Sequence, residues 1–199
     1  MDISGIGTPV NLGDDSFEGP LDIGFEFLFY ENSYSEIYIC SNGLLSFGGS
    51  HTAYYNRPIP YSPTPDNFIA PRWNDLNPSA GGDIYYHYDN VNDRFIVSYV
   101  GIPYHYYGGS FTFEAVLCPA GQIEYNYLLM RPGGYSRLSW QKSTETTVGI
   151  ENAYGSDGLQ VIYNEAYVHD SLSIIINTDW LAVSRSSRYI ALVRTRSPP

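Results

Sequence analysis

Apolar residues at every second position, separated by turn-forming residues, constrain this chain more than any other feature. Ile23, Phe25, Phe27 and Phe29 alternate with other residues in one such run, and a period of two places them on one face of a strand. No stretch keeps the apolar period of a helix for more than about two turns. With turn signals every 8 to 12 residues or so, we expect about eleven short strands. The sequence predicts an all-β fold, a two-sheet antiparallel β-sandwich with a jelly-roll-like arrangement.

The most specific local signals lie between residues 37 and 76. Asn42 and Gly43 separate two apolar runs and predict a tight hairpin turn, because both residues tolerate a positive φ. The proline-rich passage 48–67 predicts a long loop, since proline cannot donate to a β-ladder. After it, Trp73 and Asp75 predict a structural corner, where a buried indole needs an acceptor and a carboxylate accepts backbone N–H groups.

Size and charge limit the classes of partner. The 199 residues fit one β-sandwich domain over 1–177, followed by a short segment, 178–199, that is a basic tail or an extra strand. No apolar run approaches the roughly 20 residues that span a bilayer, so membrane insertion is not expected. The net charge of −11 repels phosphate backbones, so nucleic acid is not expected as a partner.

The end of the chain differs electrostatically from the body. All 21 acidic residues precede Arg185, and the last fifteen residues carry four arginines. Alternating residues within this basic segment predict one more strand, and two pairings are open to it. Folding back onto the chain's own sheet is the favoured interpretation, and pairing with the exposed sheet edge of a neighbouring copy is the alternative. The predicted assembly strand comprises Tyr189, Ile190, Ala191, Leu192, Val193 and Arg194.

Two questions about cellular context stay open from the residues alone. Cys40 and Cys118 both lie in strand-like segments, and either a disulfide or two buried free thiols fits them. The chain begins Met-Asp-Ile-Ser, without the basic and apolar regions of a signal peptide. It is therefore either intracellular or the mature form of a secreted protein.

No catalytic motif stands out, and we expect the protein not to be an enzyme. The four histidines lie in four separate segments without a metal-binding spacing, and the Gly-x-Ser-x-Gly motif is absent. Glu114 and Glu124 imitate a glycosidase carboxylate pair if they face each other across a hairpin. Solvent-facing positions on alternating strands are the favoured interpretation of both.

No cofactor is expected, with a structural calcium ion as the one metal considered. The turn from Asp89 to Asp93 and the pair Asp14 and Asp15 supply oxygen atoms of the kind that Ca²⁺ binds. Neither segment has the order of an EF-hand loop. Turns stabilised by Asp and Asn side chains are the alternative interpretation.

Tyrosines in two predicted loops offer a binding surface. Aromatic side chains in loops at one end of a sandwich suit the recognition of glycans or peptides. Tyrosines that cap the core are the alternative. The predicted ligand-binding residues are Tyr54, Tyr55, Tyr61, Tyr104, His105, Tyr106 and Tyr107.

Several motifs occur in an order that resembles a known module. They are Phe-x-Phe-x-Phe-Tyr at 25–30, Tyr-Ile-Cys-Ser-Asn-Gly-Leu-Leu-Ser-Phe at 38–47, Ile-Ala-Pro-Arg-Trp-Asn-Asp-Leu at 69–76, Arg-Phe-Ile-Val-Ser-Tyr at 94–99 and Val-Gly-Ile-Glu-Asn at 148–152. The chain resembles a β-sandwich module of bacterial secreted and cell-surface proteins. It is also similar to the nidogen-type (NIDO) extracellular domain, over roughly residues 3–177.

The resemblance implies a location and a class of function. It implies an extracellular or cell-surface protein with several domains and no established catalysis. We therefore expect a non-catalytic interaction or structural module whose partners are other domains or copies of a surface protein. A carbohydrate-binding module that uses the loop tyrosines, and a fibre subunit assembled through the C-terminal strand, are the alternatives.

Overall fold

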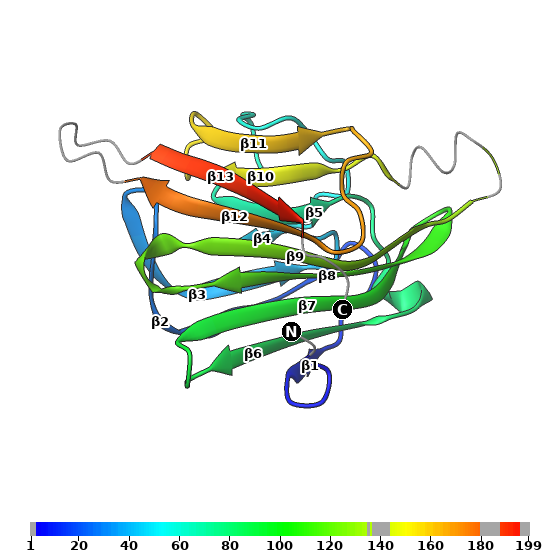
Figure 1. Ribbon diagram of the computed structural model, residues 1–199, viewed down its shortest axis with the longest axis horizontal. Coiled ribbons are helices and arrows are strands. Elements are labelled where there is room, and N and C mark those ends of the chain that lie inside the picture. The colour runs from blue at the N-terminus through cyan, green and yellow to red at the C-terminus, as the bar shows by residue number, and fades with distance from the viewer. Residues whose placement is uncertain (1–2, 135, 137–143, 180–187, 196–199) are drawn as a thin grey trace.

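The computed structural model describes residues 3–134, 136, 144–179 and 188–195, which form two antiparallel sheets (Figure 1). The seven-stranded sheet contains, in spatial order, β1 (Thr8–Val10), β6 (Asp83–Asp89), β7 (Arg94–Tyr104), β8 (Gly108–Leu117), β9 (Ile123–Pro132), β12 (Leu172–Asp179) and β13 (Arg188–Thr195). The six-stranded sheet contains β11 (Gly158–Tyr163), β10 (Thr147–Glu151), β5 (Phe68–Trp73), β4 (Leu45–Ser46), β3 (Asn32–Cys40) and β2 (Phe17–Phe29).

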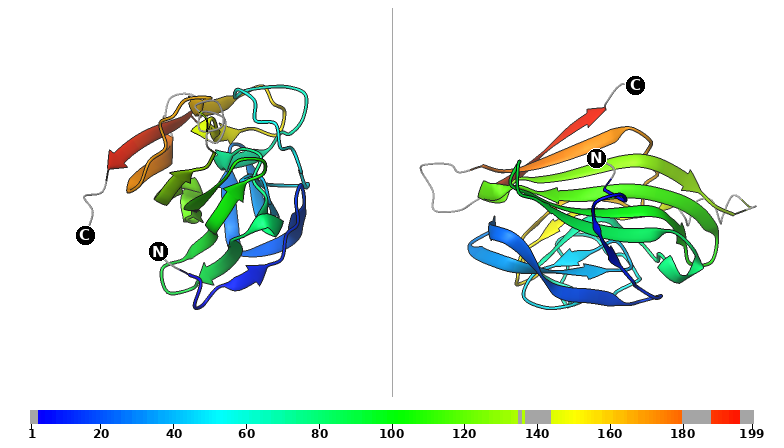
Figure 2. Two further views of the ribbon diagram at one scale, coloured as in Figure 1. Left: turned by 90° about the vertical axis from the view of Figure 1, so that its right-hand side faces the viewer. Right: turned by 90° about the horizontal axis from the view of Figure 1, so that it is seen from below.

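The two sheets pack face to face as two layers, which the right-hand view of Figure 2 shows from the side. Most consecutive strands are neighbours in their sheet, as in the runs β2 to β5 and β6 to β9. The predicted antiparallel β-sandwich is confirmed, with thirteen strands among the described residues instead of about eleven. Two short 3-10 helices, η1 (Pro78–Ala80) and η2 (Pro119–Gly121), lie between strands, and no helix of the described residues could span a membrane.

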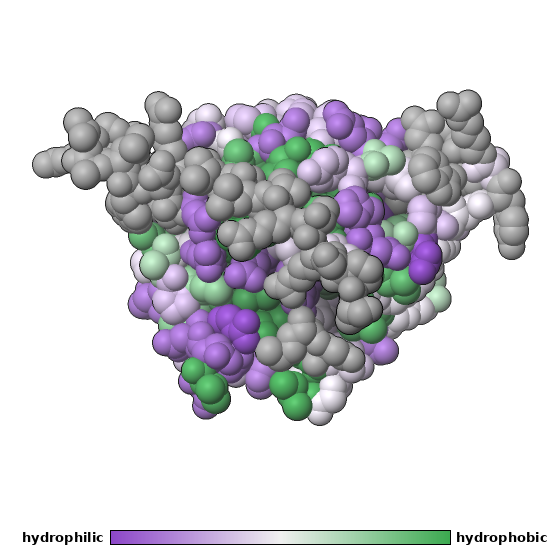
Figure 3. Space-filling view, viewed as in Figure 1, coloured by the Kyte–Doolittle hydropathy of each residue, from purple (hydrophilic) through white to green (hydrophobic). Residues whose placement is uncertain are grey.

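The core lies between the layers, and the alternating runs supply it. Ile23, Phe27 and Phe29 of β2 are buried in it, as their period predicts. On the outer face of the seven-stranded sheet, hydrophobic residues occur in small groups between hydrophilic ones (Figure 3). The sandwich therefore has one main apolar core, and smaller clusters on its outside.

Three buried tyrosines of the seven-stranded sheet donate hydrogen bonds to backbone carbonyls of the six-stranded sheet. The hydroxyl of Tyr99 donates to the carbonyl of Cys40 at 2.7 Å, that of Tyr125 to Gly149 at 2.9 Å and that of Tyr127 to Pro71 at 2.6 Å. Burial raises the pKa of all three phenols, so each hydroxyl keeps its proton and donates it. These bonds fix the position of one sheet on the other.

The carbonyl that Tyr127 contacts belongs to an irregularity in β5. The register against β10 shifts between Thr147 and Gly149, opposite Pro71 and Arg72, which fits a proline that has no N–H for the ladder. The Arg72 side chain is buried between the sheets, with its guanidinium 3.7 Å from the centre of the Phe111 ring. Burial lowers the pKa of Arg72 to about 9, so it is still charged at neutral pH.

The two cysteines are free thiols, so the disulfide considered from the sequence does not form. Cys40 is buried in a cluster with Ile59, Phe68 and Trp73, where burial raises the pKa of its thiol to about 12. Cys118 packs on a different cluster, formed by Ile3, Ile96 and Val116. Cys40, at the end of β3, and Cys118, just after β8, thus pack against two separate apolar clusters on different sheets.

The C-terminal segment contains the strand that the sequence predicts. β13 pairs antiparallel with β12 of the same chain, from Leu172 opposite Thr195 to Asp179 opposite Arg188, and forms an edge of the seven-stranded sheet. Residues 180–187 and 196–199 lie outside the described part of the chain. Pairing with a neighbouring copy stays a prediction.

The inter-sheet hydrogen bonds predict the effect of removing one hydroxyl. Tyr127→Phe leaves the Pro71 carbonyl without its 2.6 Å donor inside the core, so we expect a loss of about 1–2 kcal/mol in the free energy of unfolding. The matched control is Tyr154→Phe at an exposed ring, which should change stability by less than about 0.5 kcal/mol. Urea unfolding measures both. Equal midpoints for the two variants would contradict this role of Tyr127.

Candidate functional site

The buried side chain of Asn42 joins three loops at one end of the sandwich. Its Oδ1 accepts the N–H of Leu76 at 2.9 Å, and its Nδ2 donates to Oδ1 of Asp15 at 2.7 Å and to the carbonyl of Thr52 at 3.4 Å. Of the two turn residues only Gly43 has a positive φ, +72°, so the expectation of a positive φ at both is wrong, and a Cβ at Gly43 would collide with a backbone carbonyl. The predicted turn after β3 thus fixes the loop before β2, the proline-rich loop and the corner after β5.

The corner residues make contacts that extend this framework. The indole Nε1 of buried Trp73 donates to the carbonyl of Ala53 at 2.8 Å, which holds the start of the proline-rich loop. The backbone carbonyl of Asp75, and not the carboxylate as predicted, accepts the N–H of His105 at 2.9 Å, which holds the connection between β7 and β8. Figure 1 shows this connection and η1 at the same end of the sandwich.

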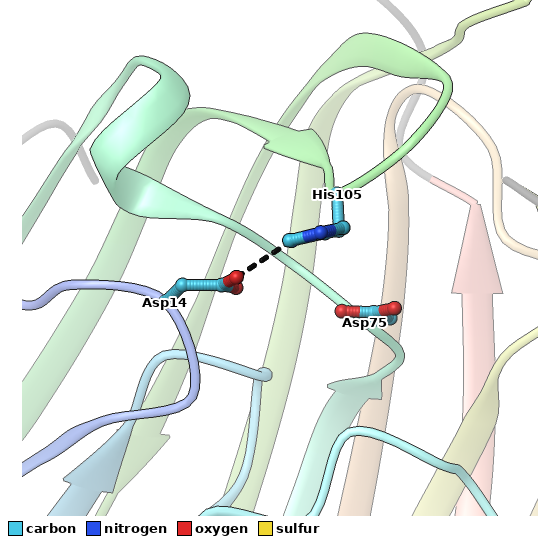
Figure 4. A group of neighbouring side chains, drawn as sticks. All are labelled: Asp14, Asp75 and His105. Atoms are coloured by element: carbon cyan, nitrogen blue, oxygen red, sulfur yellow. Dashed lines mark ion pairs between the residues drawn. The ribbon is translucent and has the colours of Figure 1, made fainter.

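Asp14, Asp75 and His105 come together at this end, from three separate segments (Figure 4). Oδ2 of Asp14 lies 2.8 Å from Nδ1 of His105, which also lies 3.1 Å from Nδ2 of Asn77. Burial raises the pKa of Asp75 to about 6; the charge of His105 opposes the shift, and the carboxylates of Asp15 and Asp14 add to it. The sequence gives no metal-ligand spacing that marks this group, because its three residues lie in separate segments.

Five of the six predicted tyrosines, all except Tyr61, line the same end, beside His105. The rings of Tyr104 and Tyr107 stack at 5.5 Å, those of Tyr54 and Tyr55 are 4.5 Å apart, and the rings of His105 and Tyr106 are 4.2 Å apart. Tyr104 is buried, and burial raises its pKa to about 12. The nearby groups Asp75, Tyr107 and Tyr55 add to this shift. We call this surface the aromatic edge; it consists of Tyr54, Tyr55, Tyr104, His105, Tyr106 and Tyr107.

Exposure divides the aromatic edge into supporting and accessible residues. Tyr106 is 75% exposed and Tyr55 is 70% exposed, whereas Tyr104 is 9% exposed. Tyr104 therefore supports the loop, as the capping alternative expects, and Tyr55 and Tyr106 are available to a partner. The capping interpretation therefore fits Tyr104, and ligand binding by Tyr55 and Tyr106 stays a prediction.

Tyr61 lies away from the aromatic edge. Its N–H donates to Oε2 of Glu151 at 2.6 Å, while the carbonyl of Arg57 accepts a bond from the hydroxyl of Thr147 at 2.7 Å. Thr147 and Glu151 are the two ends of β10. The proline-rich loop therefore runs along β10, and this path separates Tyr61 from Tyr54 and Tyr55.

The acidic turn between β6 and β7 is stabilised by its own side chains. Asp89 accepts hydrogen bonds from the N–H groups of Val91 and Asn92, both at 3.2 Å, and pairs with Arg94 at 2.7 Å. The hydrogen bond from Arg94 holds the pKa of Asp89 well below its usual range. The interpretation as a turn built on Asp and Asn side chains accounts for this segment, and the carboxylate is already occupied.

Glu114 and Glu124 do not lie directly opposite each other across the hairpin, as the carboxylate pair considered from the sequence requires. In the register of β8 and β9, Glu114 lies opposite Asn126, and Glu124 lies opposite Val116. Glu114 is buried, not solvent-facing, and accepts a hydrogen bond from Nδ2 of Asn126 at 3.1 Å. Glu114 therefore links β8 to the neighbouring strand β9.

Comparisons with known proteins match the chain to a family that is typical of extracellular proteins. The family model described as NIDO related matches residues 3–188. "Dendrite extension defective protein 1" of Caenorhabditis elegans is 34% identical over 80 residues. That alignment covers 37% of this chain and 7% of the length of the relative. No solved structure gave a significant match.

The buried carboxyl that anchors the proline-rich loop predicts a pH dependence. Burial raises the pKa of Glu151 from an ordinary 4.5 to about 7, although the bond from the Tyr61 N–H opposes the shift. The folded state therefore holds this proton more tightly than the unfolded state, and the resulting stability is present below pH 4.5 and lost as the pH rises to 7. With allowance for screening by solvent, Glu151→Gln should reduce the stability difference between pH 4.5 and pH 8 by about 2 kcal/mol.

Chemical denaturation at a series of pH values measures this difference. Glu165→Gln, at an exposed glutamate, is the matched control and should keep the wild-type pH profile. A Glu151→Gln profile that is parallel to the wild-type profile between pH 4.5 and 8 would show that this carboxyl does not titrate differently on folding.

Proposed function

Because this chain belongs to the NIDO-related family, we propose that it is a non-catalytic recognition module that binds a protein partner through the aromatic edge. Domains of this family are extracellular interaction or structural modules. The proposal assigns this general role to one surface. The observation that carries it is the exposure of Tyr55 and Tyr106 on loops whose backbones are held by buried contacts.

The physical argument concerns the cost of binding. Tyrosine offers a large amphipathic contact area and has few rotatable bonds, so little conformational entropy is lost when it is buried against a partner. Here the cost is lower still, because Trp73 fixes the loop of Tyr55 and Asp75 fixes the loop of Tyr106. Pre-organised aromatic residues are typical of the residues that dominate binding energy.

Charge indicates the kind of partner. The aromatic edge lies beside the carboxylates of Asp14 and Asp75, in a chain with a net charge of −11. A complementary partner presents basic side chains, and arginine in particular also stacks on tyrosine rings. This favours a basic protein surface over an acidic glycan, and it makes a neutral glycan the alternative ligand.

Substituting the exposed tyrosines tests the proposal. Truncating an interface tyrosine that dominates binding costs about 2 kcal/mol, so Tyr55→Ala and Tyr106→Ala together should weaken binding by tenfold or more. Tyr154→Ala is the matched control, because Tyr154 is as exposed as Tyr106 and lies in a turn that follows β10. It should leave the affinity within about twofold, since it lies outside the surface.

The probes are an array of extracellular protein domains and a glycan array, with affinities then measured on the hits. Binding to basic protein domains that the double substitution removes supports the proposal. Binding to neutral glycans that the same substitution removes supports the alternative of a carbohydrate-binding module. Binding that survives in the double variant and is lost in Tyr154→Ala would contradict the use of the aromatic edge.

The edge position of β13 supports a second candidate, assembly of copies of this chain. Among the described strands, β13 pairs on one side only, and the other side of such a strand presents N–H and C=O groups to a further strand. Light scattering across a range of protein concentrations tests this. A mass that grows with concentration in the full chain, and stays constant after residues 185–199 are deleted, supports assembly. A constant monomer mass for the full chain would exclude it.

A further inference from the structure

We propose that Asp14, Asp75 and His105 form a binding site for one divalent transition-metal ion, Zn²⁺ or Mn²⁺. The inference does not depend on a partner for the aromatic edge, because it concerns the ion alone. Figure 4 shows the imidazole of His105 and the carboxylate of Asp14 facing each other, with the carboxylate of Asp75 next to them.

The geometry fits a single ion. One ligand atom from each residue lies within 4.8 Å of the other two. That separation is close to twice a metal–ligand bond of about 2.1 Å, so small side-chain rotations bring all three atoms onto one ion. The closest pair, Oδ2 of Asp14 and Nδ1 of His105, is 2.8 Å apart, and an ion bound between them would replace the proton there and the contact of Nδ1 with Nδ2 of Asn77.

The charges and hydrogen bonds leave room for a cation. The charged groups that act on the Asp75 carboxylate are His105, Asp15 and Asp14, so negative charge is in excess. Oδ1 of Asp14 is buried, and it has no hydrogen-bond partner among the described residues. A buried carboxylate oxygen without a donor is costly, and a cation bound by both oxygens of Asp14 would satisfy it.

The backbone holds the three ligands in place before any ion binds. Asp14 precedes a segment fixed by the bond from the Ser16 N–H to Oγ of Ser41 at 3.0 Å and by the contact between Asp15 and Asn42. The N–H of His105 donates to the carbonyl of Asp75 itself, so these two ligands are joined directly. A site whose ligands are already fixed loses little conformational entropy when the ion binds.

The ligand set selects the type of ion. Imidazole is typical of Zn²⁺ and related first-row ions, whereas Ca²⁺ and Mg²⁺ prefer sites made only of oxygen atoms. A site with one nitrogen and two carboxylates therefore favours Zn²⁺ or Mn²⁺ over the calcium expected at Asp14 and Asp15 from the sequence. Three protein ligands also leave coordination positions for water or for a group of a partner.

The test is calorimetric titration of the chelator-treated 199-residue chain with ZnCl₂, MnCl₂ and CaCl₂ in separate experiments. We expect one ion per chain for Zn²⁺ or Mn²⁺, and a loss of affinity of at least about tenfold in His105→Ala and in Asp75→Asn, since each removes one ligand. His87→Ala, on β6, is the matched control and should bind as the wild type does.

A second measurement keeps the test independent of folding defects. Asp14→Asn changes no volume, and circular dichroism at matched temperature shows whether each variant is folded. In the wild type, bound Co²⁺ should give visible absorption bands that all three substitutions remove. The proposal is overturned by no saturable binding of Zn²⁺ or Mn²⁺ up to about 1 mM, by equal affinity in folded Asp14→Asn and the wild type, or by binding of Ca²⁺ alone.

Discussion

The buried amide of Asn42 is the contact on which one end of this molecule depends. A single side chain satisfies the N–H of Leu76, the carboxylate of Asp15 and the carbonyl of Thr52, which belong to loops far apart in the sequence. The N–H of buried Leu76 would be costly to leave unpaired in the core. Because one amide serves all of these partners, the loops adopt their positions together, and the next residue, Gly43, lets the chain turn close enough for this.

The sandwich gives this end a rigid base. Tyr99, Tyr125 and Tyr127 connect the two sheets by hydrogen bonds to backbone carbonyls, so the loops that leave different sheets keep a constant separation. On that base, the aromatic edge and the group of Asp14, Asp75 and His105 are neighbours, with His105 common to both. An apolar contact surface and a concentrated negative charge therefore occur side by side, as suits a recognition module.

The alternating runs and the Asn-Gly turn could be predicted from the sequence, because a period of two and a positive φ are local properties. The site could not, because it depends on which strands share a sheet. Asp14, Asp75 and His105 meet only after β5 and β7 enter opposite layers. The path of the proline-rich loop along β10 separates Tyr61 from Tyr55. The sheet face on which Cys40 and Cys118 lie depends on strand register, because a shift of one residue moves a side chain to the opposite face.

Amide hydrogen exchange in an Asn42→Ala variant tests most directly whether one side chain holds these loops together. The account predicts faster exchange at Leu76, which loses its acceptor, and at His105, whose acceptor is the carbonyl of the adjoining Asp75. Amides of β8, such as that of Phe113, should keep their protection, because the sandwich is intact. Unchanged exchange at Leu76 and His105 in a folded variant would contradict the central role of Asn42.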